Sequence, residues 1–116
     1  MNQLLFINRF KFLNFDNNLL IGCGKIVSAS IADKKLTVLI DNTGSIDGLE
    51  GTADGDYIFS DWQGNIYLAG TEKTIIKILD TSAAGINAAD IEFIPAKRIL
   101  LVPTFNDNRV MAYELR

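Results

Sequence analysis

The 116-residue sequence contains no histidine, a single cysteine and no long apolar run. Without histidine, this chain cannot by itself build a Ser-His-Asp or Cys-His nucleophile. The lone thiol, Cys23, allows neither an internal disulfide bond nor a thiolate zinc site. Its setting between Gly22 and Gly24 is typical of a small buried residue rather than of a reactive thiol. These absences exclude the most familiar nucleophilic and thiolate chemistries.

The apolar segments are all short. The run at 4–7 is too short for the apolar core of a signal peptide, and Asn8, Arg9 and Lys11 follow it closely. No segment approaches the ~20 apolar residues that a membrane helix needs. The sequence therefore predicts a soluble chain with no membrane partner, cytoplasmic as given. The compartment of a longer parent protein, which could be secreted or periplasmic, stays open.

Charge is also low and evenly spread. The formal net charge is −3, and the basic residues are scattered, with adjacent pairs only at 34–35 and 97–98. Nucleic-acid-binding domains concentrate Lys and Arg on one face, so we expect no nucleic-acid partner. With 48% hydrophobic and 22% charged residues, the composition is that of a globular domain.

Short β-type runs, separated by Gly, Asn and Asp, fill the chain. Such runs, rich in Ile, Val, Leu, Tyr and Phe and bounded by turn residues, predict strands. No window sustains a helical period, and 82–89 is the one place where a helical turn is expected. The expected strands cover 11–15, 18–22, 25–31, 35–40, 48–52, 56–60, 65–69, 74–79, 90–93, 98–102 and 109–115. The predicted fold class is all-β.

The same strand pattern recurs along the chain. A segment that begins at Asp47 and passes through Trp62 returns forty-three residues later (47 to 90), beginning at Asp90 and passing through Phe105. An earlier copy precedes the middle one by 38 to 40 residues, with 19–22 standing for 57–60. A four-strand unit that recurs at about 40–45 residues is typical of a β-propeller blade.

We therefore predict a partial β-propeller of roughly 2.5 to 3 four-stranded antiparallel blades, within a ring of about six. The single domain at 1–116 would divide into units near 8–46, 47–89 and 90–116. A β-sandwich of hairpins has similar strand spacing but does not explain the repeat. A ring needs at least about four blades, so either the chain is a fragment of a longer protein, which we favour, or copies self-associate to complete the ring.

Two stretches carry a family resemblance. The residues DGL at 47–49 with YIFSDWQGNIY at 57–67, and ADIEFIP at 89–95 with LVPTFNDNRVMAY at 101–113, resemble the C-terminal blades of gluconolactonase-like propellers, the regucalcin or senescence-marker-protein superfamily. That superfamily is related in turn to the NHL-repeat propellers. At the level of blades the resemblance covers most of residues 8–115.

The resemblance implies a divalent cation on the central axis, held by one Glu, two Asn and one Asp at the starts of inner strands. Oxygen ligands of this kind suit Ca²⁺, Mg²⁺ or Mn²⁺, and Zn²⁺ is a further candidate. Asp47 matches the family's Asp. Asn8 falls at the position of an Asn ligand, although Arg9 replaces the glycine that usually follows, and Asp90 is the equivalent position one blade later. The remaining ligands would lie in blades outside this chain.

Each of these side chains has an alternative role. An Asp or Asn at the start of a strand also fixes a turn by hydrogen-bonding its own backbone. This alternative stays open for Asp47 and is favoured for Asp90 and Asn8. Trp62 and Phe105 are expected to pack between blades rather than to form a substrate platform, and the segment 54–56 reads as a hairpin turn.

Two functions follow from the resemblance. The first is the C-terminal part of a metal-dependent hydrolase of sugar lactones or similar esters, with a small-molecule substrate, in which this chain alone is not expected to be catalytically competent. The second is a non-catalytic, NHL-like propeller whose central face binds a ligand or a protein. The fold does not choose between them.

Overall fold

The computed structural model describes residues 9–12, 17–22, 25–30, 32–41, 43–70 and 74–116, with side chains from residue 25 onward. The described elements confirm the all-β prediction. Two 3₁₀ turns, η1 (Ser82–Ala84) and η2 (Phe105–Asp107), are the only helical segments in these ranges, and neither is long enough to cross a membrane. The strands are β1 (Arg9–Phe12), β2 (Asn17–Gly22), β3 (Lys25–Ser30), β4 (Leu36–Ile40), β5 (Ile46–Gly51), β6 (Tyr57–Asp61), β7 (Asn65–Ala69), β8 (Ile75–Asp80), β9 (Glu92–Ile94), β10 (Ile99–Thr104) and β11 (Arg109–Glu114).

The strands form three antiparallel sheets in which neighbours along the chain are neighbours in the sheet. The first sheet has the order β1-β2-β3-β4, the second β5-β6-β7-β8, and the third β9-β10-β11. They span 9–40, 46–80 and 92–114, close to the expected units 8–46, 47–89 and 90–116. The division into blade units itself stays a prediction.

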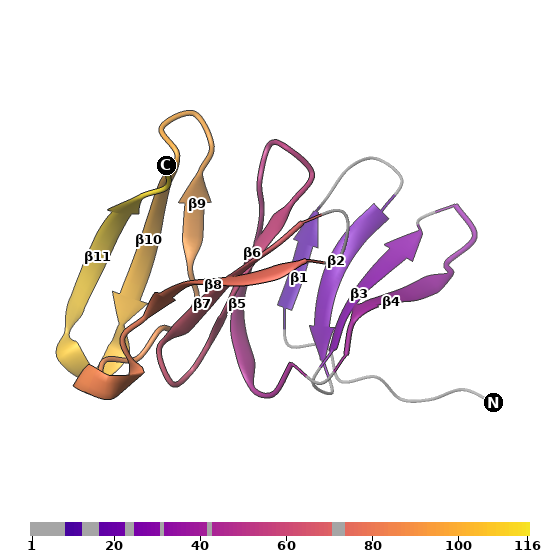
Figure 1. The fold of residues 1–116 in the computed structure, drawn as a ribbon. Coiled ribbons are helices and arrows are strands. Elements are labelled where there is room, and N and C mark those ends of the chain that lie inside the picture. The colour runs from indigo at the N-terminus through magenta and orange to yellow at the C-terminus, as the bar shows by residue number, and fades with distance from the viewer. Residues whose placement is uncertain (1–8, 13–16, 23–24, 31, 42, 71–73) are drawn as a thin grey trace.

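The three sheets stack in chain order, with the second between the other two (Figure 1). The first strands of the sheets meet, since β5 contacts both β1 and β9. Two separate apolar clusters fill the two interfaces. One joins the first and second sheets (Ile26, Ile40, Leu49, Tyr57, Phe59 and Ala69), and the other joins the second and third (Ile58, Ile66, Ala88, Ile91, Phe93, Leu100 and Val102).

Burial on both faces follows from the sequence of β6. Successive side chains of a strand point to opposite faces. Tyr57 and Phe59 therefore pack toward the first sheet, whereas Ile58 and Ser60 face the third, and all four are buried. A strand without a polar alternation is the pattern expected for a sheet that is covered on both sides.

A hydroxyl group joins the second sheet to the loop that leads into the third. Ser60 is fully buried, and its Oγ accepts a hydrogen bond from the Gly48 amide (3.0 Å) and donates one to the Ala89 carbonyl (3.0 Å). A Cβ at Gly48 would lie 2.6 Å from the backbone nitrogen of Ile91. Only glycine therefore allows β5 and the start of the third sheet to approach so closely.

Several strand boundaries differ by one to three residues from the sequence-based expectation, and two of these differences have a clear physical reason. β5 begins at Ile46 rather than near Gly48, because the register shift between Ile46 and Leu49 places Asp47 and Gly48 inside the strand as a bulge. β10 continues through Pro103, which lies beyond the last residue that pairs with β9. The proline therefore interrupts no ladder bond, and its carbonyl accepts a hydrogen bond from Ala89.

The expected hairpin turn at 54–56 is confirmed. The Thr52 hydroxyl accepts hydrogen bonds from the amides of Asp54 (3.3 Å) and Asp56 (3.2 Å), and Gly55 takes a positive φ of 86°. The turn is thus held by local hydrogen bonds between β5 and β6.

Candidate functional site

The second and third sheets gather their longest connections at one end, which we call the loop end (the lower end in Figure 1). β5 begins there, since Ile46 pairs with Asp61 at the end of β6. β8 ends there, because Asp80 pairs with Asn65. The segment 81–91 then leads from β8 to β9 and carries η1. This is the end at which the sequence analysis expects the site.

Asp61 fixes the β6–β7 turn at the loop end. Its Oδ1 accepts hydrogen bonds from the amides of Gly64 (3.1 Å) and Asn65 (3.0 Å), and its Oδ2 accepts one from the Asn65 side chain (2.9 Å). A carboxylate that satisfies the backbone in this way is a turn cap. It therefore holds the position of Trp62, the next residue.

The connection to the third sheet locks the same turn from the other side. The Thr81 hydroxyl lies within hydrogen-bonding distance of the carbonyls of Gly64 (3.1 Å) and Ile86 (2.8 Å), and the Thr81 amide donates to Gly64 (3.0 Å). The Asn87 side chain donates to the Trp62 carbonyl (3.2 Å). The backbone at Trp62 is thus held both by the Asp61 cap within the β6–β7 turn and by the segment that leads from β8 to β9.

Two aromatic rings meet at the loop end. Trp62 and Phe105 lie 5.5 Å apart between ring centroids, tilted by 52°. This contact between the second and third sheets agrees with the expected packing role. The rings nevertheless keep 41% and 67% of their residue surface exposed, so together they also form an apolar surface.

A polar pocket adjoins the Trp62 ring. Its volume is about 480 Å³. The Oγ1 of Thr43 is buried beside it and has no hydrogen-bond partner among the described residues. Its lining consists of the β4–β5 connection and the capped turn (Thr43, Gly44, Ser45, Asp61, Trp62 and Gln63). Hydroxyl, amide and carboxylate groups next to an exposed aromatic ring are what a small polar ligand needs for binding.

The candidate metal ligands have different settings. Asp47 is half-buried and is the second residue of β5. Asp90 is exposed and precedes β9 by two residues. Asn8 lies outside the described residues, as does Cys23. Within the described ranges, no three His, Cys, Asp or Glu side chains come together as a metal site.

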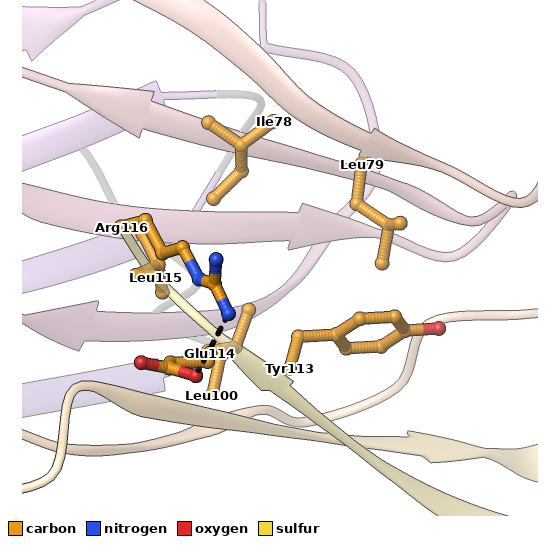
Figure 2. Close-up of a pocket in the computed structure, with 7 residues that line it drawn as sticks. All are labelled: Ile78, Leu79, Leu100, Tyr113, Glu114, Leu115 and Arg116. Carbon is orange, nitrogen blue, oxygen red and sulfur yellow. Dashed lines mark ion pairs between the residues drawn. The ribbon is translucent and has the colours of Figure 1, made fainter.

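A second, apolar cleft of about 270 Å³ lies between β8 and the C-terminal strand. Figure 2 shows Ile78 and Leu79 facing Tyr113 across it, with Glu114 and Arg116 paired at its rim (3.7 Å). Ile78, Leu79 and Tyr113 also pack against the cluster between the second and third sheets. This cleft is therefore the outer part of a packing interface, and it carries no convergent polar groups.

The sequence analysis missed the polar pocket wall. Thr43, Ser45 and Gln63 form no motif, and they become neighbours only because β5 and β6 pair at Ile46 and Asp61. The repeat did mark Trp62 and Phe105 as equivalent positions, which was the one available signal for this end of the molecule.

No protein-family model matches the chain, and no curated protein matches it.

Proposed function

We propose that the chain forms three consecutive blades of a β-propeller and that its loop end is the ligand-binding face. The observation that carries the proposal is that the second sheet is covered on both faces while β1, β5 and β9 run next to one another. A two-layer sandwich covers only one face of each sheet, whereas blades around an axis bury both faces and bring their first strands together.

Contacts between equivalent residues support an axis. Gly48 and Ile91 are one repeat apart, as are Trp62 and Phe105, and both pairs are in contact. Equivalent residues of neighbouring blades are related by a rotation about the axis, so their separation grows with their distance from it. Equivalent residues therefore touch only where they lie close to the axis. The aromatic pair thus belongs to the central part of the loop end, where propellers bind their ligands.

The resemblance would make the ligand a sugar lactone or a related ester and the parent protein a cation-dependent hydrolase. Asp47 is the described residue best suited to contribute a ligand, because it is half-buried and adjoins the closely packed Gly48. A bound divalent cation would polarise the carbonyl or activate water. Ca²⁺ takes about six to eight oxygen ligands, so Asp47 would need further donors from outside the described residues.

A calorimetric titration with Ca²⁺, Mn²⁺ and Zn²⁺ tests the hydrolase function. We expect micromolar binding that Asp47→Ala abolishes and that the control Asp54→Ala, at an exposed position of the β5–β6 turn, retains. No binding at millimolar metal, or equal binding by wild type and Asp47→Ala, would overturn the role of Asp47.

The Trp62–Phe105 pair favours a second candidate, a non-catalytic binding propeller. The rings supply a rigid apolar surface, and the adjoining pocket supplies neutral hydroxyl and amide groups, so a small hydroxylated molecule could bind without a cation.

Fluorescence separates the two candidates, since Trp62 is the single tryptophan. D-Glucono-1,5-lactone and D-gluconate are titrated with and without EDTA. Binding that survives EDTA and is lost in Phe105→Ser, but not in the control Ile76→Ser on β8, supports the second candidate. Binding that requires the cation and Asp47 supports the first, and an unchanged spectrum throughout contradicts both for these two ligands.

A further inference from the structure

Both outer sheets of the stack present apolar side chains on the side that faces away from the second sheet. In the third sheet, Leu100, Val102 and Thr104 are buried toward the second sheet, so the alternate side chains of β10 point the other way. The register adds Val110 and Ala112, which lie opposite Pro103 and Leu101. The apolar residues of this far face are Ile94, Ile99, Leu101, Pro103, Val110 and Ala112, and Val110 is 63% exposed.

The first sheet presents a similar face on the opposite side of the stack. The register shift between Ile26 and Val27 turns Ile40 toward the second sheet and leaves Leu36 and Val38 on the other side. These two side chains are 52% and 46% exposed, and Ala29, opposite Leu36, shares their face. We call this surface the free face of the first sheet.

Repeat proteins normally protect their ends. The outermost repeats of a stacked array need a polar outer surface, because each repeat otherwise buries its apolar face against a neighbour. Among the described residues, the outward-facing side chains named above are apolar in both outer sheets. Contiguous apolar surface of this kind marks an interaction site.

We propose that two copies of this chain associate head to tail, so that the far face of the third sheet of each copy packs on the free face of the first sheet of the other. The occupant follows from continuity: each internal interface already joins one sheet of this type to the next through its first strand. If the same sheet-to-sheet packing continues beyond the third sheet of one copy, the next sheet is the first sheet of the other copy.

Charge favours the same pairing. Glu92 lies on the far face of the third sheet, two residues from Ile94, and Lys25 lies on the free face of the first, two residues from Val27. Opposite charges at the borders of an apolar contact favour this orientation over the pairing of two identical faces.

Two contacts of this kind, one in each direction, close a dimer of two copies. The faces are on opposite sides of the stack (Figure 1), so the contact is heterologous and either closes into a ring or extends into a filament. Three blades span about half of a six-bladed ring, which lets two copies close. The inference rests on the blade arrangement proposed above, but a monomer could still bind ligand at its loop end, so the two proposals fail separately.

Light scattering after size exclusion, on the 116-residue chain, tests the association. Val110→Asp and Leu36→Asp each place a charge on one of the two faces, at exposed positions where the fold should tolerate it. Ile76→Asp is the matched control, because Ile76 is 58% exposed and lies on β8, away from both faces. Circular dichroism melts check that all three variants fold like wild type.

We expect wild type and Ile76→Asp at twice the chain mass and each face variant at the chain mass. An equimolar mixture of the two face variants should form dimers again. The intact far face of Leu36→Asp can still pack on the intact free face of Val110→Asp. A wild-type monomer, a dimer insensitive to Leu36→Asp, a mixture that stays monomeric, or open-ended multimers of wild type would each overturn the proposal.

Discussion

The second sheet packs against its two neighbours with different chemistry. Toward the first sheet it presents aromatic rings: Phe59 and Tyr67 stack with centroids 5.0 Å apart, and Lys77 lies over the Tyr67 ring at 5.9 Å. Toward the third sheet it presents Ile58, Ile66 and the hydrogen-bonded Ser60. On the side of the first sheet the second sheet contributes aromatic rings, whereas on the side of the third sheet it combines aliphatic side chains with a close approach of the backbones.

The difference teaches how each interface specifies its geometry. Large rings exclude water and tolerate small shifts, because their contacts are many and non-directional. The Gly48–Ser60–Ala89 bridge is directional, since one hydroxyl must meet an amide and a carbonyl at once. Substitutions on the two faces of the second sheet should therefore lower its stability for different reasons: lost packing on one face, and backbone clashes or unpaired polar groups on the other.

The largest effect is expected on the aromatic face. Phe59→Ala removes a buried ring and leaves a cavity, which should lower the free energy of unfolding by about 3–5 kcal/mol. Urea denaturation of the variant measures it. The exposed Ile76→Ala on β8 serves as control and should change stability by less than about 0.5 kcal/mol.

On the opposite face, Gly48→Ala should cost about 3 kcal/mol, because the new methyl group meets the Ile91 backbone nitrogen in addition to the side chains of Ile91 and Ser60, and the backbone cannot rotate away. The control is Gly70→Ala, whose Cβ would meet the Thr74 hydroxyl at 3.1 Å and the Asp56 carboxylate at 3.8 Å. Equal stability of both variants in urea would show that the sheets do not approach at Gly48.

Ser60→Ala should cost about 2 kcal/mol, since it leaves the Gly48 amide and the Ala89 carbonyl without their shared partner. Amide hydrogen exchange locates the effect: protection of Gly48 should fall more than that of Phe59. The exposed Ser45→Ala is the control and should alter neither stability nor Gly48 protection.

The smallest effect is a pH dependence from the aromatic face. Burial raises the pKa of the Tyr57 phenol above its ordinary value of about 10. The folded state therefore holds this proton more tightly than the unfolded chain does. Stability is complete below pH ~10 and declines as the pH rises through the folded pKa. Thermal melts across this range should show a smaller decline for Tyr57→Phe, and identical declines would contradict the shift.

Much of the fold was predictable because strand signals in this chain are local. Apolar runs bounded by Asp, Asn and Gly gave strand bounds that mostly agree with the structure within about two residues. The period of forty-three residues paired Trp62 with Phe105, and the two rings do meet.

The features that the sequence did not reveal depend on the register in which the strands pair. The bulge that places Asp47 inside β5 arises from pairing with β6, and no local pattern marks it. The pocket wall, with the buried Thr43 hydroxyl, likewise forms where separate segments converge at the loop end. Side chains brought together by pairing have no fixed spacing in the sequence.

The most direct test of the stacked arrangement is the nuclear Overhauser effect between Gly48 and Ile91. The arrangement predicts a strong cross-peak from the Gly48 α-protons to the Ile91 side chain, because a Cβ at Gly48 would lie 2.7 Å from Ile91 Cγ1. If cross-peaks between Gly51 and Tyr57 within the second sheet are present while the Gly48–Ile91 peak is absent, the second and third sheets do not pack through their first strands, and the blade arrangement is wrong.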